Sequence, residues 1–169
     1  AEGRVAIAVV GSNAAIVEIR CESAPTAKND HFAKLADALA KHVAEHNPAD
    51  VTALLAQKFG SATVQDRINE VVGLIREKMI IQRFAQVSGG SFGQYVHHDG
   101  TVGVLVECSG GAANDELLRD VAAHIAALNP PYMTVATVPA DVVDKEKALV
   151  KADMDVDAKN AGKPANIIE

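Results

Sequence analysis

The chain has 169 residues, a formal net charge of −6 at pH 7 and a composition that is 49% apolar and 22% charged, which is typical of a folded globular protein. The acidic balance and the lack of any basic block argue against a protein that binds nucleic acid directly through its phosphates. No apolar run approaches the length of a membrane span and the start does not resemble a signal peptide, so we expect a cytoplasmic protein with no membrane partner.

The first third of the chain predicts a β-hairpin followed by a helix. Strand patterns at residues 4–10 and 14–20 flank Gly11-Ser12-Asn13, whose small polar residues suit a hairpin turn. Apolar residues then recur at helical spacing within residues 32–43. Pro48 follows this helix and ends it, because proline lacks an amide donor and restricts the residue before it.

The middle of the chain predicts another helix and a further strand. Residues 64–75 repeat the helical spacing after Ser61-Ala62-Thr63, where a hydroxyl is available to cap the helix. Residues 79–87 have a strand pattern, which Ser88-Gly89-Gly90 ends.

A second hairpin and two more helices are predicted in the remainder. Strands at residues 92–98 and 102–108 surround Asp99-Gly100, the strongest hairpin signal in the chain. A helix over residues 117–128 follows. Another is predicted from Pro139, whose fixed φ suits a first helical turn, until Gly162-Lys163-Pro164 ends it, and residues 165–169 resemble the start of one more helix.

The chain repeats itself, because residues 9–19 align with residues 98–108 and each copy is followed by a helix that ends on H-x-A-x-x-N-P. A repeated hairpin–helix unit predicts an α+β fold with two similar lobes, each a small antiparallel sheet packed against helices. We place the N-terminal lobe at residues 1–88 and the C-terminal lobe at residues 89–169.

The strongest candidate for metal chemistry is His97-His98-Asp99, which combines two imidazoles and a carboxylate. Adjacent residues of a strand point to opposite faces, so we expect His97 and His98 to face solvent or a partner and not to share one ion. Glu18 and Glu107 occupy matching positions of separate lobes, where nothing brings them together as an acid–base pair. We therefore expect no metal, no cofactor, no catalytic residue and no enzymatic activity.

The other histidines and the cysteines have structural interpretations. His42 and His124 lie on or beside apolar helical stripes, where we expect histidines whose polar atoms are satisfied near the core. Cys21 and Cys108 are far apart in sequence and form no C-x-x-C motif, so we expect reduced thiols.

Several features are more typical of a protein interface than of an enzyme. The two hairpin tips and the glycine-rich junction at residues 88–91 carry small polar residues, and Tyr132 and Met133 follow two prolines. Tyrosine and methionine are favoured where proteins meet. Packing of the same two side chains beneath the second lobe is an equal alternative.

Several motifs, in order along the chain, resemble the bacterial elongation factor Ts family. The similarity extends from Glu2 to Glu169. Its motifs are V-E-I-R-C-E at 17–22, A-K-N-D at 27–30, Y-V-H-H-D-G-T-V-G-V-L-V-E at 95–107, H-I-A-A-L-N-P at 124–130, V-P-A-D-V-V-D-K-E at 138–146 and G-K-P at 162–164. The resemblance implies a two-lobed, internally duplicated core, which agrees with the repeat.

The resemblance also implies a function. Members of this family are guanine nucleotide exchange factors for elongation factor Tu, the GTPase that brings aminoacyl-tRNA to the ribosome. They promote GDP release by displacing Mg²⁺ and distorting the phosphate pocket. The same partner is implied here, and a homodimer or a 2:2 complex is compatible with it. The alternative is a protein that binds and stabilises this GTPase without exchanging its nucleotide.

The family's metal-displacing segment is usually Thr-Asp-Phe-Val, and the four matching positions here are Ser23, Ala24, Pro25 and Thr26. The acidic residue and the aromatic wedge are both absent. Ser23 is still able to cap a short helix, and Pro25 is tolerated in its first turn. Either Glu22 and neighbouring backbone displace the metal, or the chain relies on other contacts.

The remaining partner contacts implied by the resemblance lie elsewhere along the chain. The family's Ile-Gly-Glu corresponds to Ile75-Arg76-Glu77, which is a second departure from the pattern. The hairpin histidine, here His97 or His98, is kept and in the family faces the partner's distal domain. Family members carry an N-terminal helical module and continue past the matched region, so we expect the C-terminal lobe to be incomplete at its C-terminus.

Overall fold

The computed structural model describes residues 2–110 and 114–156 of the chain. Contacts between residues divide the chain into two units, Ala1–Asn129 and Pro130–Glu169. The helix end and the further helix start that we predict within residues 162–169 lie outside the described residues.

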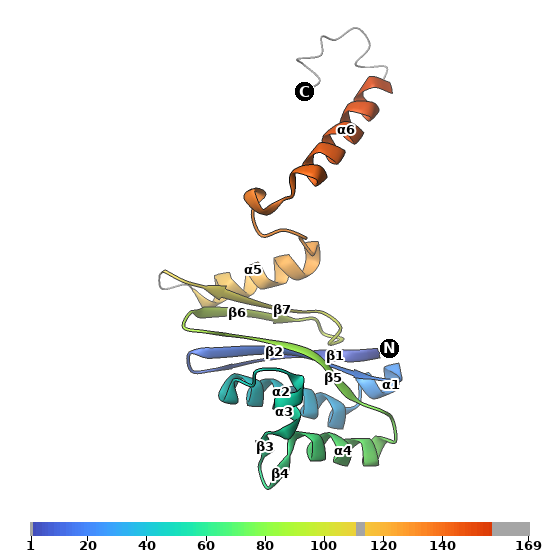
Figure 1. Cartoon of the computed structure of the whole chain (residues 1–169), viewed down its shortest axis with the longest axis vertical. Coiled ribbons are helices and arrows are strands. Elements are labelled where there is room, and N and C mark those ends of the chain that lie inside the picture. Colours follow the sequence, from blue (N-terminus) through green and yellow to red (C-terminus); the bar gives the residue numbers. More distant parts are fainter. Residues whose placement is uncertain (1, 111–113, 157–169) are drawn as a thin grey trace. The chain divides into compact units, whose positions relative to one another are not determined.

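Three antiparallel strands form the first sheet, in the order β1 (Glu2–Val10), β2 (Asn13–Cys21) and β5 (Ile80–Ser88) (Figure 1). Successive side chains of a strand point to opposite faces, and the β2 residues Val17 and Ile19 are fully buried on one of them. All three strands agree with the sequence prediction to within two residues at each end.

Helices cover one face of this sheet, namely α2 (Asp30–His46), α3 (Val51–Ala56) and α4 (Val64–Ile75) (Figure 1). The periodicity of the sequence predicts α2 and α4. It does not predict α3 or the short hairpin of β3 (Lys58–Phe59) and β4 (Ala62–Thr63), because elements of two to six residues are too short to establish a period.

The main hydrophobic core lies between the first sheet and these helices. Its largest fully buried side chains are Phe32, Leu39, Val43, Leu54, Val64, Val17 and Ile19. The apolar stripe that the sequence predicts on α2 therefore faces the sheet, and these fully buried side chains are aliphatic apart from Phe32.

A second hairpin, β6 (Ser91–Val96) and β7 (Gly103–Cys108), lies on the other face of the first sheet with α5 (Asp115–Leu128) outside it (Figure 1). The two layers approach closely at Gly103, where a Cβ atom would lie 2.5 Å from the Val5 side chain. A glycine is needed here because any side chain would push the layers apart.

The packing of α5 on β6 also depends on a glycine. A Cβ atom at Gly93 would lie 2.3 Å from the carbonyl oxygen of Leu118, so the helix backbone rests directly on the strand. Leu118 and Ala122 are the buried residues of α5. The contact between hairpin and helix thus combines close backbone approach at Gly93 with the buried side chains of Leu118 and Ala122.

The duplication is visible in the backbone of the two helices that follow the hairpins. Asn29 and Asn114 each cap a helix by accepting the amide two residues further on, both at 2.8 Å. Asn47 and Asn129 end these helices in the left-handed conformation, with φ of 47° and 46°. The α+β fold of small antiparallel sheets and helices is confirmed, while the lobe boundary after residue 88 stays a prediction.

The described part of the second unit contains the 3-10 turn η1 (Val135–Thr137) and the helix α6 (Ala140–Val156). Pro139 begins α6, as predicted, because its carbonyl accepts the amides of Val142 and Val143 at 3.1 and 3.2 Å. No helix among the residues described here combines the length and apolar content needed to cross a membrane.

Candidate functional site

One helical turn, α1 (Ala24–Ala27), follows β2 closely and contains Ala24, Pro25 and Thr26, which we expect from the resemblance to correspond to the family's metal-displacing segment. Ser23 caps it by accepting the Thr26 amide at 3.4 Å, and Pro25 occupies its first turn, as expected. Ala24 and Pro25 are exposed, whereas Thr26 is buried. Only part of this segment is therefore accessible to a partner.

Glu77 holds α1 in place, a role that the resemblance of Ile75-Arg76-Glu77 to the family's Ile-Gly-Glu does not predict. Its carboxylate accepts the Ser23 amide at 3.1 Å and the Ser23 hydroxyl at 2.5 Å. Because the Ser23 hydroxyl bonds to the charged form, the pKa of Glu77 lies below its ordinary value. The two residues are 54 positions apart, and no periodic signal could have paired them.

A second contact joins the same two parts of the chain. The Glu22 carboxylate accepts the Lys78 amide at 3.4 Å, next to Arg76, which ends α4 and is exposed. Ile75 is half-buried and packs against the core. We define the α1 surface as the residues that these contacts bring together: Glu22, Ser23, Ala24, Pro25, Arg76 and Glu77.

The two histidines of the second hairpin lie in its turn, which corrects the prediction that they belong to a strand. β6 ends before them, so the alternation of faces does not apply, and the ring centroids of His97 and His98 lie 4.2 Å apart. His97 Nδ1 also lies 3.1 Å from the hydroxyl of Tyr95. Within the described parts of the chain, no three histidine, cysteine or acidic side chains gather as a metal ion would require.

The tip of this hairpin is fixed to the edge of the first sheet. The Val5 amide donates to the Gly100 carbonyl at 2.8 Å, and Gly100 is covered by the Arg4 side chain. This contact lies near the start of β1, where Glu2 pairs with Cys21 just before α1. The histidine tip and the α1 surface therefore lie at the same end of the first sheet (Figure 1).

Glu18 has a structural interpretation. It forms an ion pair with Arg20 of the same strand at 2.7 Å and one with Arg83 at 2.6 Å, and the second pair joins β2 to β5. Burial raises its pKa, but hydrogen bonds and charge from the two guanidinium groups outweigh burial, so the pKa lies below its ordinary value. Glu107, its counterpart in the repeat, is exposed.

The two helical histidines differ. His42 is 4% exposed and its Nε2 lies 2.9 Å from Gln57 Oε1, so the expected satisfied core histidine is confirmed. His124 is exposed, and the same expectation is wrong there because α5 buries only the opposite side of the helix. Cys21 and Cys108 are free thiols.

Tyr132 and Met133 lie in the second unit. Tyr132 is half-buried, and Met133 is 95% exposed. Packing beneath the second lobe and contact with a partner both stay predictions for these two residues.

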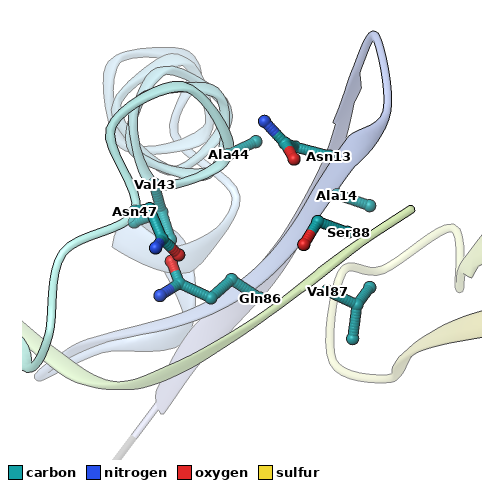
Figure 2. Close-up of a pocket in the computed structure, with 8 residues that line it drawn as sticks. All are labelled: Asn13, Ala14, Val43, Ala44, Asn47, Gln86, Val87 and Ser88. Atoms are coloured by element: carbon teal, nitrogen blue, oxygen red, sulfur yellow. The ribbon is translucent and has the colours of Figure 1, made fainter.

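A polar pocket of about 200 Å³ lies at the end of the first sheet away from α1 (Figure 2). Asn13, Asn47, Gln86 and Ser88 provide its polar side chains. Gln86 donates through Nε2 to the Pro48 carbonyl at 3.1 Å, while its Oε1 is buried without a partner in the described structure. A small molecule that donates a hydrogen bond would satisfy this oxygen.

The fold and the α1 surface together define an α+β protein with a duplicated hairpin–helix unit and an exposed surface suited to contact with a partner. The family model described as Elongation factor TS matches residues 26–169. Proteins named Elongation factor Ts are similar to this chain over nearly its whole length. The protein from Herminiimonas arsenicoxydans is 42% identical over 170 residues, which cover 99% of this chain and 55% of the relative. Those from Leptothrix cholodnii (43% over 177 residues) and Lactiplantibacillus plantarum (41% over 173 residues) match 100% of this chain and 56% and 57% of their own lengths. The chain belongs to the elongation factor Ts family, and it spans about half the length of these relatives.

Proposed function

We propose that this chain is the core of a guanine nucleotide exchange factor for elongation factor Tu. Membership of the elongation factor Ts family supports the proposal. The structural observation that carries it is the Ser23–Glu77 contact, because it unites the two segments that the resemblance relates to partner binding. The His97–His98 tip, the third expected contact, lies at the same end of the sheet.

The proposed mechanism uses binding free energy and no covalent step. A protein that binds the nucleotide-free GTPase more tightly than the GDP-bound form weakens GDP binding by the same factor. A protein with equal affinity for both forms would shift nothing. The α1 surface acts beside the partner's Mg²⁺ and phosphate pocket, and the histidine tip holds a distal domain.

Glu22 is the residue that we assign to metal displacement. Ala24 and Pro25 provide neither charge nor an aromatic ring, and the Glu77 carboxylate is already occupied by Ser23. Glu22 is exposed, and the hydrogen bond that its carboxylate accepts in the described structure, from the Lys78 amide, is long at 3.4 Å. Its negative charge is the one best placed to compete for Mg²⁺, which prefers carboxylate oxygen.

The release of a fluorescent GDP analogue from elongation factor Tu tests the proposal. The complete protein should accelerate release, Glu22→Gln should reduce the acceleration, and Glu116→Gln, an exposed acid of α5, should not. An unchanged release rate with the unsubstituted complete protein contradicts the exchange function. Light scattering of the same complex would establish whether it is 1:1 or 2:2.

The second candidate function is a partner that binds the same GTPase without exchanging its nucleotide. The absence of both the aspartate and the phenylalanine from residues 23–26 favours it. Tight binding to nucleotide-free elongation factor Tu, together with unaccelerated GDP release, would support this candidate over the first.

A further inference from the structure

Arg76 ends α4 in a backbone conformation that arginine disfavours. Its φ is 63° and its ψ is 32°, in the left-handed region. The other described non-glycine residues with positive φ are Asn47 and Asn129, and asparagine tolerates this region far better than arginine does. Unfavourable backbone of this kind persists only where the surroundings impose it, and it is concentrated at functional sites.

The surroundings of Arg76 impose the conformation from both sides. Its amide donates to the Val72 carbonyl at 2.7 Å, which fixes the end of α4. The next residue, Glu77, is held by Ser23, and Lys78 donates to Glu22. Arg76 is thus locked into the α1 surface by contacts that do not involve its own side chain.

The guanidinium of Arg76 is exposed and makes no hydrogen bond or ion pair in the described structure. By contrast, Arg67 on the same helix pairs with Glu70, and Arg83 pairs with Glu18. The neighbouring Glu77 carboxylate does not neutralise Arg76, because it accepts both donors of Ser23. The α1 surface therefore presents an unpaired positive charge on a chain whose net charge is −6.

We propose that Arg76 determines the specificity of this surface by binding a carboxylate on the partner protein. A guanidinium matches the two oxygens of a carboxylate, and its rigid geometry fixes orientation. A phosphate has similar chemistry, but the nucleotide is absent from the tightest complex of an exchange factor, so the anion must belong to the protein. The proposal rests on the proposed function, since it names the group that the α1 surface recognises on elongation factor Tu.

Substitution of Arg76 separates recognition from folding. Arg76→Gly and Arg76→Asn both relieve the backbone, so thermal unfolding should show each variant to be at least as stable as the parent. Their affinity for nucleotide-free elongation factor Tu should nevertheless fall by about tenfold or more, the usual effect of losing a hydrogen bond to a charged group. Arg76→Lys should bind at an intermediate level, because lysine keeps the charge and loses the bidentate geometry.

Titration calorimetry at low and high salt supplies the decisive measurements. The parent's affinity should fall more steeply with salt than that of Arg76→Gly, and Arg67→Gln, the matched exposed arginine of α4, should behave like the parent. Equal affinities of the parent and Arg76→Gly for nucleotide-free elongation factor Tu would overturn the assignment. Tighter binding of the parent to elongation factor Tu in the presence of GDP would also overturn it, because Arg76 would then bind a phosphate of the nucleotide. No binding by the parent would defeat the proposed function itself, a result distinct from both.

Discussion

Single side chains decide where the candidate site lies and how firmly it is held. Ser23 would cap α1 in any case, but the position of that turn against the α4–β5 connection depends on Glu77. His42 has a comparable role in the core, where it connects α2 to Gln57 after α3. Each of these contacts depends on the protonation state or charge of one residue, and each can be tested separately.

Glu77→Gln should loosen α1. The amide side chain cannot accept both donors of Ser23 with the strength of a carboxylate, because hydrogen bonds to charged groups are stronger than those between neutral groups. Hydrogen exchange measured by NMR should show faster exchange of the Ser23 and Ala27 amides, with unchanged protection in the middle of α2. Unaltered exchange in α1 would mean that the cap alone holds the turn.

His42 should make stability depend on pH. Burial lowers its pKa, and the neighbouring His46 lowers it further, so the unfolded state binds more protons once the pH falls below the ordinary value of 6.5. The free energy of unfolding should therefore decrease as the pH falls from about 7.5 to about 5.5. Urea titrations at several pH values should show a smaller decrease in the free energy of unfolding for His42→Gln than for the parent. The same dependence of this free energy on pH in parent and variant would contradict the assignment to His42.

At the scale of elements, the repeated hairpin–helix unit uses the same backbone devices twice. An asparagine cap begins each helix, and an asparagine in the left-handed conformation ends it. The connection between hairpin and helix contains α1 in the first copy, whereas in the second copy the structure describes only part of the corresponding connection. In the first copy this turn lies against the α4–β5 connection, where Glu77 accepts two hydrogen bonds from Ser23.

The two helix caps should contribute similar amounts to stability. Asn29→Ala and Asn114→Ala each remove an acceptor for a helix amide and should each lower the free energy of unfolding by about 1 kcal/mol. Replacement by Ser, which also caps, should restore most of the loss. Urea unfolding measures both, and a negligible change at either position would show that its helix does not depend on the cap.

At the scale of the first unit, stability depends on backbone layers that approach closely. The β6–β7 hairpin separates the first sheet from α5, and glycines permit the contacts on both of its sides. A methyl group added at Gly93 or Gly103 would overlap atoms of the neighbouring layer, so these contacts leave no space for a side chain. The main core cluster beneath the first sheet consists of other residues, which come mainly from the first sheet and the helices that cover it.

Gly93→Ala should destabilise the protein by about 2 kcal/mol or more, because its Cβ would overlap the Leu118 carbonyl and force α5 away from β6. Gly73→Ala is the matched control, since Gly73 lies within α4 with no atom near its Cβ position. That substitution should raise stability by about 0.5–1 kcal/mol through the helix propensity of alanine. Urea unfolding measures both changes in the free energy of unfolding, and changes of the same sign in the two variants would contradict this account.

Most of the fold could be predicted from the sequence because its signals are local. The stripe on α2, the capping residues of α4 and the two hairpin turns depend on neighbours within a few positions. The same reasoning failed for His97 and His98. β6 ends at Val96, two residues earlier than predicted, so the expectation that these side chains point to opposite faces of a strand does not apply. It also failed for His124, because a helical stripe does not reveal how wide a buried face will be.

The longer helices and strands, the repeat and the resemblance to the family could all be recognised from the sequence alone, since each depends on residue types at fixed spacing. The three-dimensional fold was needed to establish that Ser23 lies against Glu77, that Arg76 is held in the left-handed region, and that Thr26 is buried. The first of these depends on a contact between residues some fifty positions apart, and the spacing of residues along the sequence does not show which such residues lie close together in space.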